Sequence, residues 1–249
     1  MCVSRWAMIY VDVKGGTPVF IAGMQKLTLL DYPGKVACTV FTAGCDLRCP
    51  FCHNASLALP DRPRDSMEVS DVLDFLKKRQ GILDGVAVTG GEPLLHRQTA
   101  ELLGEIKALG YSVKLDTNGT FPQRLREIVS AGLVDRVAMD IKAAPENYGK
   151  LVGLDGFDIS PVQESAEYLM GCGVDYEFRT TAVKGLHTEH DFEAISEWIA
   201  GAKEYYIQEF KDSGDLIAGT GLSGFDEKEM AALADIVRPK VPSVKVRGI

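Results

Sequence analysis

Short apolar runs, rich in β-branched residues, alternate with longer amphipathic segments through most of this chain. The alternation begins near residue 36 and repeats six times. Six runs of this kind predict strands: VACTVF (36–41), VAVTG (86–90), SVKLDT (112–117), RVAMDI (136–141), YEFRTT (176–181) and YYIQEF (205–210). Because strands that alternate with helices form parallel βαβ units, the pattern predicts an α/β fold.

The segments between these runs have the periodicity of helices. In the segment 97–110, Leu102, Leu103, Ile106 and Leu109 form one apolar stripe, with polar residues on the opposite side. The predicted helices cover residues 71–79, 97–110, 123–132, 161–173 and 189–201. Six βα units are compatible with a full or partial barrel, and an open doubly wound sheet is the alternative.

The two ends of the chain depart from this pattern. The first 23 residues predict additional strand or hairpin structure around the turn KGGTP (14–18). The tail SVKVRGI (243–249) predicts a final short strand, and no low-complexity linker divides the rest. We therefore expect an N-terminal extension, residues 1–23, followed by a single domain, residues 24–249.

Polar clusters follow the predicted strands at the point where each strand ends. They are TGGEP (89–93), LDTNG (115–119), MDIK (139–142) and FRTT (178–181), and a cysteine-rich loop follows the first strand in the same way. In parallel α/β folds the strand-to-helix loops gather at one edge of the sheet, where ligands bind. The sequence therefore predicts a single site built by five loops.

Composition and charge narrow the class of protein. The chain has 249 residues, 46% hydrophobic and 25% charged, with a formal net charge of −8. No basic cluster indicates binding to nucleic acid phosphates, and no apolar run of about 18 residues indicates a transmembrane helix. The N-terminus lacks the features of a signal peptide. We therefore expect a cytoplasmic protein that binds neither nucleic acid nor membrane and keeps its thiols reduced.

Three cysteines, Cys45, Cys49 and Cys52, lie within eight positions in the loop after the first predicted strand. A structural zinc site takes four ligands, and the fourth here is either the adjacent His53 or a distant residue. A disulfide is disfavoured in a reducing compartment. A 4Fe–4S cluster usually takes four thiolates, so three would leave one iron open to a substrate. The spacing favours the cluster and leaves zinc and a disulfide as alternatives.

The spacing Cys-x3-Cys-x2-Cys, with Phe51 directly before the last cysteine, resembles that of the radical S-adenosylmethionine (SAM) enzymes. The resemblance implies a barrel fold, here a partial (βα)6 barrel, with the cysteines after the first strand. It implies that Cys45, Cys49 and Cys52 are metal ligands and catalytic residues that hold a 4Fe–4S cluster. The free iron would bind the amino and carboxylate groups of SAM. Phe51 is a flat apolar side chain, and we expect it to pack on the adenine.

The segment TGGEP resembles the GGE motif of the same family. The resemblance implies that Gly90, Gly91 and Glu92 lie near the amino group of SAM. Glycine lets a main chain approach a ligand closely, and a carboxylate accepts a charge-assisted hydrogen bond from an ammonium. A SAM-contacting loop is therefore expected after the second predicted strand.

Three segments, CDLRCPFCHN (45–54), LDTNG (115–119) and MDIK (139–142), resemble a narrower group, the glycyl-radical-enzyme activating proteins. In that group, matching segments and an arginine at a strand end lie near SAM. The residues assigned to SAM in this way are Asp116, Thr117, Asn118, Asp140, Lys142 and Arg179. Some members bind a monovalent cation beside SAM, and the matching positions are Asp116, Thr117 and Asp140.

The segment MQKLTLLDYPGKVACTVFTAGC (24–45) and the terminal VKVRG resemble the activating proteins of anaerobic ribonucleoside-triphosphate reductase. The resemblance implies an oxidoreductase that cleaves SAM with an electron from a flavodoxin or ferredoxin. The 5′-deoxyadenosyl radical would then take a hydrogen from a glycine of the partner, a glycyl-radical enzyme. Two alternatives remain: a radical SAM enzyme acting on a small molecule or modified nucleoside, and a non-catalytic metal-binding or electron-carrier protein.

Overall fold

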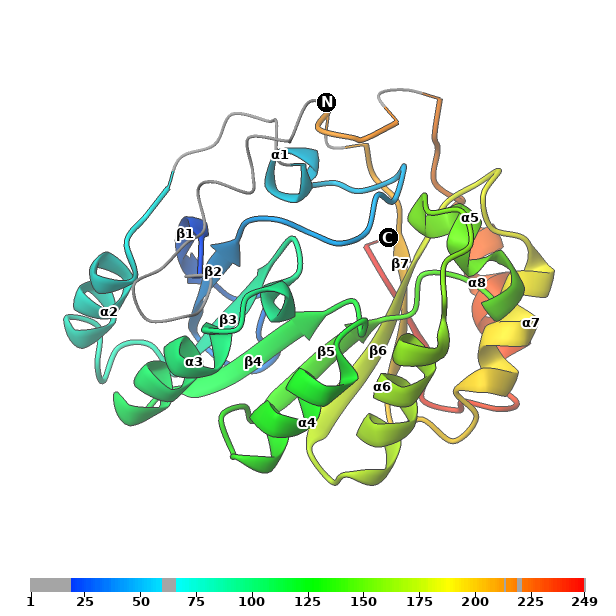
Figure 1. Ribbon diagram of the computed structural model, residues 1–249. Helices are drawn as coiled ribbons and strands as arrows, with labels where there is room; N and C mark the ends of the chain where they lie inside the picture. Colours follow the sequence, from blue (N-terminus) through cyan, green and yellow to red (C-terminus); the bar gives the residue numbers. More distant parts are fainter. Residues whose placement is uncertain (1–18, 60–65, 213, 219–220, 249) are drawn as a thin grey trace.

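The computed structural model describes residues 19–59, 66–212, 214–218 and 221–248. In these residues eight strands form one sheet whose order follows the chain (Figure 1). The strands are β1 (Ile21–Thr28), β2 (Ala37–Thr42), β3 (Gly85–Gly90), β4 (Ser112–Thr117), β5 (Arg136–Asp140), β6 (Asp175–Ala182), β7 (Tyr205–Glu209) and β8 (Lys245–Arg247). The six strands predicted from residue 36 onward are β2 to β7, and the strand predicted in the tail is β8.

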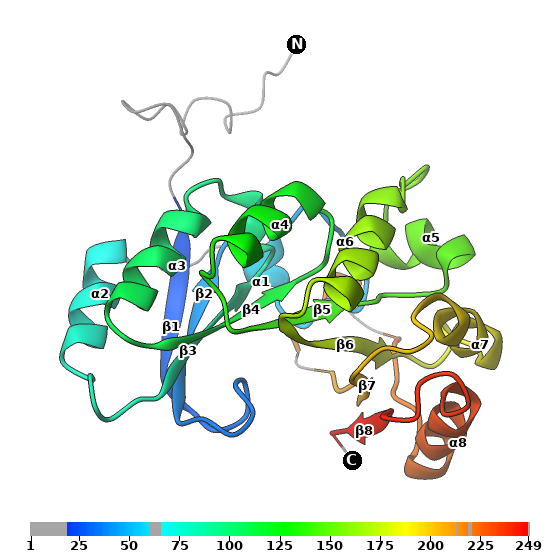
Figure 2. The same ribbon diagram turned by 90° about the horizontal axis from the view of Figure 1, so that it is seen from below.

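The sheet is mostly parallel and does not close into a full barrel. β2 to β8 pair in parallel, whereas β1 lies antiparallel beside β2. Among the described residues β1 and β8 form the two edges, and the strands curve between them (Figure 2). A doubly wound sheet reverses its strand order at a switch point, and here the order never reverses. The predicted partial barrel is confirmed.

Helices connect the parallel strands, and most of them cover the outer side of the curved sheet (Figure 2). They are α1 (Ala55–Ala58), α2 (Val69–Lys77), α3 (Thr99–Ala108), α4 (Pro122–Ser130), α5 (Tyr148–Val152), α6 (Ser160–Gly171), α7 (Glu189–Trp198) and α8 (Glu227–Val237), with single 3₁₀ turns at Pro93–Leu95 and Pro145–Asn147. The five predicted helices are α2, α3, α4, α6 and α7, and each end agrees to within three residues. The sequence pattern misses α1, α5 and α8.

The predicted N-terminal extension, residues 1–23, lies mostly outside the described residues, which begin at Val19. β1 begins at Ile21, inside the predicted extension, and continues to Thr28. The boundary at residue 23 therefore stays a prediction. Within the described part of the chain, no helix combines the length and the apolar character that crossing a membrane requires.

A cluster of paired charges lies near the amino ends of β5 and β6, with Glu177 fully buried and the side chain of Arg136 11% exposed. Arg136 of β5 contacts Asp175, Glu177 at 2.8 Å and Glu204 at 2.5 Å. Glu177 is fully buried and also accepts a hydrogen bond from Arg247 of β8 at 3.3 Å. A buried charge is costly unless it is paired, so this cluster ties β5, β6 and β8 together. It lies at the edge of the sheet opposite the polar loops.

Candidate active site

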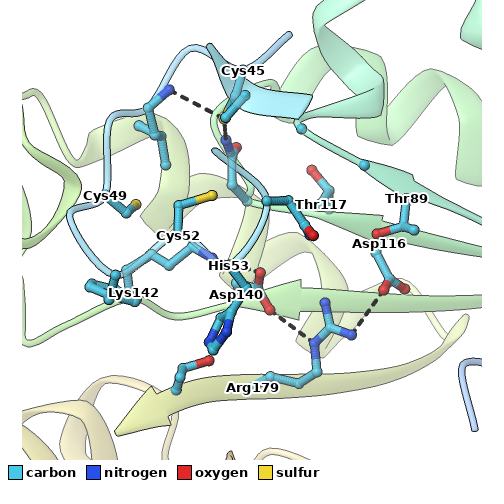
Figure 3. A pocket seen from close by; sticks show the side chains of 18 of the residues that line it. Cys45, Cys49, Cys52, His53, Thr89, Asp116, Thr117, Asp140, Lys142 and Arg179 are labelled. Atoms are coloured by element: carbon cyan, nitrogen blue, oxygen red, sulfur yellow. Dashed lines mark hydrogen bonds and ion pairs between the residues drawn. The ribbon is translucent and has the colours of Figure 1, made fainter. Parts of the chain in front are cut away.

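The loops after the parallel strands enclose one cavity of about 260 Å³ (Figure 3). Every predicted site residue except Glu92 lines it: Cys45, Cys49, Phe51, Cys52, Gly90, Gly91, Asp116, Thr117, Asn118, Asp140, Lys142 and Arg179. Thr181, from the predicted cluster FRTT, and Gln208 line it as well, although neither was among the predicted site residues. The structure therefore brings together side chains that are up to 163 positions apart in the sequence, from Cys45 to Gln208.

The cysteine loop, residues 43–54, is held on one side by α5. The Arg48 main-chain N–H donates to Val152 O at 2.8 Å, and its guanidinium donates to Cys45 O and Leu47 O, each at 2.7 Å. Gly153 ends α5 with φ +71°, and a Cβ there would lie 2.3 Å from Arg48 O. These contacts fix the loop main chain between the first two cysteines.

The segment after β7 holds the other side of the cysteine loop. Asp215 accepts hydrogen bonds from Ala55 N through its main-chain oxygen at 3.1 Å and from Ser56 N through Oδ2 at 2.9 Å. The His53 ring lies 5.1 Å from the Phe210 ring, centroid to centroid. Sequence reasoning missed Asp215, because no motif connects it to a loop 160 positions earlier.

The three thiols supply the type of ligand that an iron–sulfur cluster takes. Burial raises the pKa of Cys49 to about 11, although the positive charge of Lys142 acts in the opposite direction. Burial also raises the pKa of Cys45. Because metals bind the thiolate, loading this site must release protons. Among the described residues no three Cys, His, Asp or Glu side chains converge on a single ion, whereas in a cluster the thiolates bind different irons.

A chain of alternating charges forms another part of the cavity wall, and Figure 3 shows Arg179 in it, bonded to Asp140 and Asp116. Arg179 donates from Nε to Asp140 Oδ1 and from a terminal nitrogen to Asp116 Oδ2, both at 2.9 Å. Lys142 pairs with Asp140 at 2.7 Å, and Lys114 pairs with Asp116 at 2.5 Å. The guanidinium of Arg179 therefore lies between the carboxylates of Asp116 and Asp140. These are two of the positions that the family resemblance assigns to a monovalent cation.

Opposite charges keep both carboxylates of this wall ionised. Burial alone would raise the pKa of Asp140, but Arg179 and Lys142 lower it to about 2. The same balance, with Arg179 and Lys114 as the cations, lowers the pKa of Asp116. Among the residues that line the cavity, Lys142 and Arg179 balance Asp116 and Asp140, so this wall presents cationic donors and anionic acceptors to a ligand.

Glu92 lies behind the cavity wall rather than in it. Its side chain is fully buried and accepts hydrogen bonds from Leu94 N at 2.9 Å, Thr117 Oγ1 at 2.9 Å and Asn118 N at 2.6 Å. Burial raises the pKa of Glu92 to about 8, against the effect of these donors. In this structure Glu92 joins the loops after β3 and β4, and its predicted contact with an ammonium stays a prediction.

The two glycines of TGGEP let the loop after β3 lie against the loop after β2. Gly91 N donates to Thr42 O at 3.0 Å, and Glu92 N donates to Gly44 O at 2.8 Å. A Cβ on Gly90, whose φ is +130°, would lie 2.1 Å from Thr42 O. Only glycine fits such an approach.

Replacing Gly91 with alanine is expected to push these two loops apart, because the new Cβ would lie 2.0 Å from Gly44 O. Overpacking typically costs about 1–3 kcal/mol, and contact between two main chains favours the upper part of that range. Urea unfolding measures the loss. The control is Gly104→Ala within α3, where the nearest side-chain atom, Leu133 Cδ2, lies 3.8 Å away. That change should stabilise the helix by about 0.5–1 kcal/mol. Equal stability of Gly91→Ala and the unchanged protein would contradict the close approach.

Known proteins resemble this chain in sequence over much of its length. The family model of the radical SAM superfamily matches residues 39–199. A Methanocaldococcus jannaschii protein named "putative glycyl-radical enzyme activating enzyme" is 31% identical over 236 residues, covering 92% of this chain and 96% of that protein. The 7-carboxy-7-deazaguanine synthase of Halobacterium salinarum is 40% identical over 91 residues, which are 35% of each chain.

Solved structures share the fold. Streptococcus suis SuiB, determined with bound S-adenosylmethionine, superposes with a TM-score of 0.65 at 15% identity. The match covers 82% of this chain and 48% of SuiB, so this chain spans about half the length of that protein. At this level of identity the likeness concerns the fold alone.

Proposed function

The chain belongs to the radical SAM superfamily, and on that premise we propose that it activates a glycyl-radical enzyme. The observation that carries the proposal is the meeting of three thiols and a chain of paired charges in one cavity. The Methanocaldococcus jannaschii relative, similar over nearly its whole length, supports the activating type. We assign the activity to the domain formed by residues 24–249.

We assign the 4Fe–4S cluster of this superfamily to Cys45, Cys49 and Cys52. The three side chains line the same cavity from one loop, and that loop is fixed from both sides by hydrogen bonds. Three thiolates satisfy three irons and leave the fourth for a ligand. Lys142, which lowers the pKa of Cys49 against burial, would offset part of the negative charge of the loaded site.

The other residues that line the cavity carry groups that suit the carboxylate, the ammonium, the ribose and the adenine of SAM. Lys142 and Arg179 are cationic donors for the carboxylate of SAM, and Asp116 and Asp140 are acceptors for its ribose hydroxyls or ammonium. The main chain of Gly90 and Gly91 is open to the ammonium. Phe51 lines the cavity beside the cysteines, and we assign the contact with the adenine to it.

Bound together, a cluster and SAM supply one-electron cleavage of a carbon–sulfur bond, giving methionine and a 5′-deoxyadenosyl radical that takes a hydrogen atom from a glycine Cα. The chain contributes orientation and the exclusion of water. Leu47 and Phe51 are 2% and 3% exposed beside the cysteines, so the thiol side of the cavity is apolar. Such surroundings keep a reactive radical from side reactions.

The proposed partner rests on the resemblance of residues 24–45 and the terminal VKVRG, and the proposed conditions rest on the chemistry of the cluster. We propose anaerobic ribonucleoside-triphosphate reductase as the glycyl-radical enzyme and a flavodoxin or ferredoxin as the electron donor. Oxygen attacks exposed clusters, so we place the protein in anaerobic cytoplasm. The Asp116–Arg179–Asp140 arrangement already pairs both carboxylates with a cation of the chain itself. A bound monovalent cation would therefore have to displace or join the guanidinium.

Anaerobic reconstitution with iron and sulfide tests this function. We expect visible absorption from the cluster, and cleavage of SAM to methionine and 5′-deoxyadenosine after reduction with dithionite. Addition of the partner reductase should then give the electron paramagnetic resonance (EPR) doublet of a glycyl radical. A reconstituted protein that never cleaves SAM would instead support a non-catalytic metal-binding or electron-carrier protein.

A second function is favoured by one specific similarity. The Halobacterium salinarum relative that acts in 7-deazaguanine chemistry matches about a third of this chain. A radical SAM enzyme for a small molecule or modified nucleoside would use the same cysteines and the same SAM contacts. SAM cleavage that is stimulated by a nucleoside or another small molecule, with no radical on the reductase, would favour this alternative.

A further inference from the structure

Asn118 connects the loops after three neighbouring strands. Its main-chain N–H donates to Glu92 Oε2 of the loop after β3, at 2.6 Å. Its side-chain Nδ2 donates to Asp46 Oδ1 of the cysteine loop, at 2.9 Å. The residue itself follows β4 and is only 5% exposed. The family resemblance assigns Asn118 to SAM, but in this structure its side-chain amide is directed to the cysteine loop.

The same amide nitrogen faces the first cysteine. Asn118 Nδ2 lies 3.9 Å from Cys45 Sγ, a long contact that is within reach of a large sulfur atom. Leu47 N also donates to this sulfur, at 3.4 Å, and Asp46 Oδ1 lies 3.9 Å from it. A primary amide has two N–H groups, so one can bond the Asp46 carboxylate while the other points to the sulfur.

The orientation of the amide is fixed by its oxygen. Asn118 Oδ1 accepts hydrogen bonds from Thr120 N at 2.9 Å and from Thr120 Oγ1 at 2.7 Å. With the oxygen bonded to two donors, the NH₂ end must face Asp46 and Cys45. The bond from Asn118 N to the buried Glu92 holds the main chain in the same place.

We propose that Asn118 is a positioning residue that tunes the cluster through Cys45. It directs one N–H toward the thiolate and bonds the Asp46 carboxylate with the other, so that both groups next to the amide are held in place. Hydrogen bonds to cluster sulfurs stabilise the reduced state, which carries one more negative charge, and so raise the reduction potential. The inference rests on the proposed function, because it requires a cluster on Cys45.

A redox titration of the reconstituted protein without SAM tests the proposal, using Asn118→Ser. Serine keeps a side-chain acceptor for Thr120 N but has no N–H that reaches the sulfur. We expect the equilibrium constant for reduction of the cluster to fall about fivefold to tenfold. For a one-electron couple, a tenfold change lowers the reduction potential by about 59 mV. The matched control is Asn147→Ser, because Asn147 Nδ2 forms the same amide–carboxylate pair with Asp191 at 2.8 Å, outside the cavity. The control should keep the wild-type potential.

A second measurement decides the case if Asn118→Ser takes up no cluster. Wild-type protein labelled with ¹⁵N only in asparagine side chains should show a nitrogen coupling in pulsed EPR of the reduced cluster. That coupling should survive Asn54→Ser, which changes the other asparagine of the cavity. An unchanged potential in Asn118→Ser, or the absence of the coupling, overturns the proposal. A wild-type protein that forms no cluster would instead overturn the proposed function.

Discussion

Replacing any of Cys45, Cys49 or Cys52 with serine is expected to abolish cluster uptake and SAM cleavage together. Three thiolates are the only protein ligands that we assign to the cluster, and a serine hydroxyl does not ionise in the range where a thiol does. With two ligands, the loop would no longer retain iron and sulfide. Visible absorption after anaerobic reconstitution measures uptake, and methionine release after reduction measures cleavage; both should fall to background.

The control for this prediction is Cys172→Ser. Cys172 is a half-buried free thiol at the end of α6, and its Sγ contacts Leu169 O at 3.7 Å, away from the cavity. That variant should load and cleave like the wild type. A triad variant that keeps both the absorption and the cleavage would show that the cluster is held elsewhere. Circular dichroism of each variant separates loss of a ligand from loss of the fold.

Much of the fold could be predicted because buried parallel strands leave a strong pattern. The run SVKLDT corresponds residue for residue to β4, Ser112–Thr117. β1 was harder to predict because it is an edge strand. Its residues Gln25 to Leu27 are exposed, so the strand lacks a continuous apolar pattern. α5 has five residues, too few for a helical period. α8 did carry a signal, since Asp226 and Glu229 form a capping box at its start.

The sequence predicted which loops form the site, but it did not predict the direction in which each side chain points. The spacing of the cysteines, the polar clusters at strand ends and the family resemblance gave 12 of the 19 residues that line the cavity. A motif cannot say which way a carboxylate turns, and Glu92 turns behind the wall to bind the main chain of the next loop. Lys114 was also missed, although a residue two positions before Asp116 must share its face of the strand.

Replacing Arg179 with alanine is expected to destabilise the fold strongly at neutral pH. The side chain is 13% exposed and bridges Asp116 and Asp140, both of which line the cavity. Removing one partner of a buried ion pair typically costs about 3–5 kcal/mol, because the remaining charge stays buried. Since Lys114 and Lys142 still pair with one carboxylate each, we expect about 3 kcal/mol, the lower end of that range. Urea unfolding at pH 7.5 measures it.

The pH dependence of this loss distinguishes an electrostatic cause from a packing cause. In the wild type the pKa of Asp140 is lowered to about 2. The ion pairs of Asp140 therefore stabilise the fold fully when the pH is above the ordinary pKa of an aspartate, and this stabilisation is lost as the pH falls toward 2. Without Arg179, burial pushes the pKa of both carboxyl groups upward, and they take up protons at a higher pH. The difference between variant and wild type should therefore shrink as pH falls from 7.5 to 5.

An arginine in a surface ion pair is the matched control. Arg126 and Glu164 are joined at 3.1 Å with side chains 45% and 48% exposed, so Arg126→Ala should cost at most about 1 kcal/mol at either pH. Arg179→Lys is expected to fall between the two, because an ammonium keeps the charge but cannot reach both carboxylates with a planar fork. If Arg179→Ala lost no more stability than Arg126→Ala, or lost the same amount at pH 5 as at pH 7.5, the alternating charges would not be what holds this wall. In that case the packing of β4, β5 and β6 would hold the wall in place. Its charged side chains would then act only in binding the ligand.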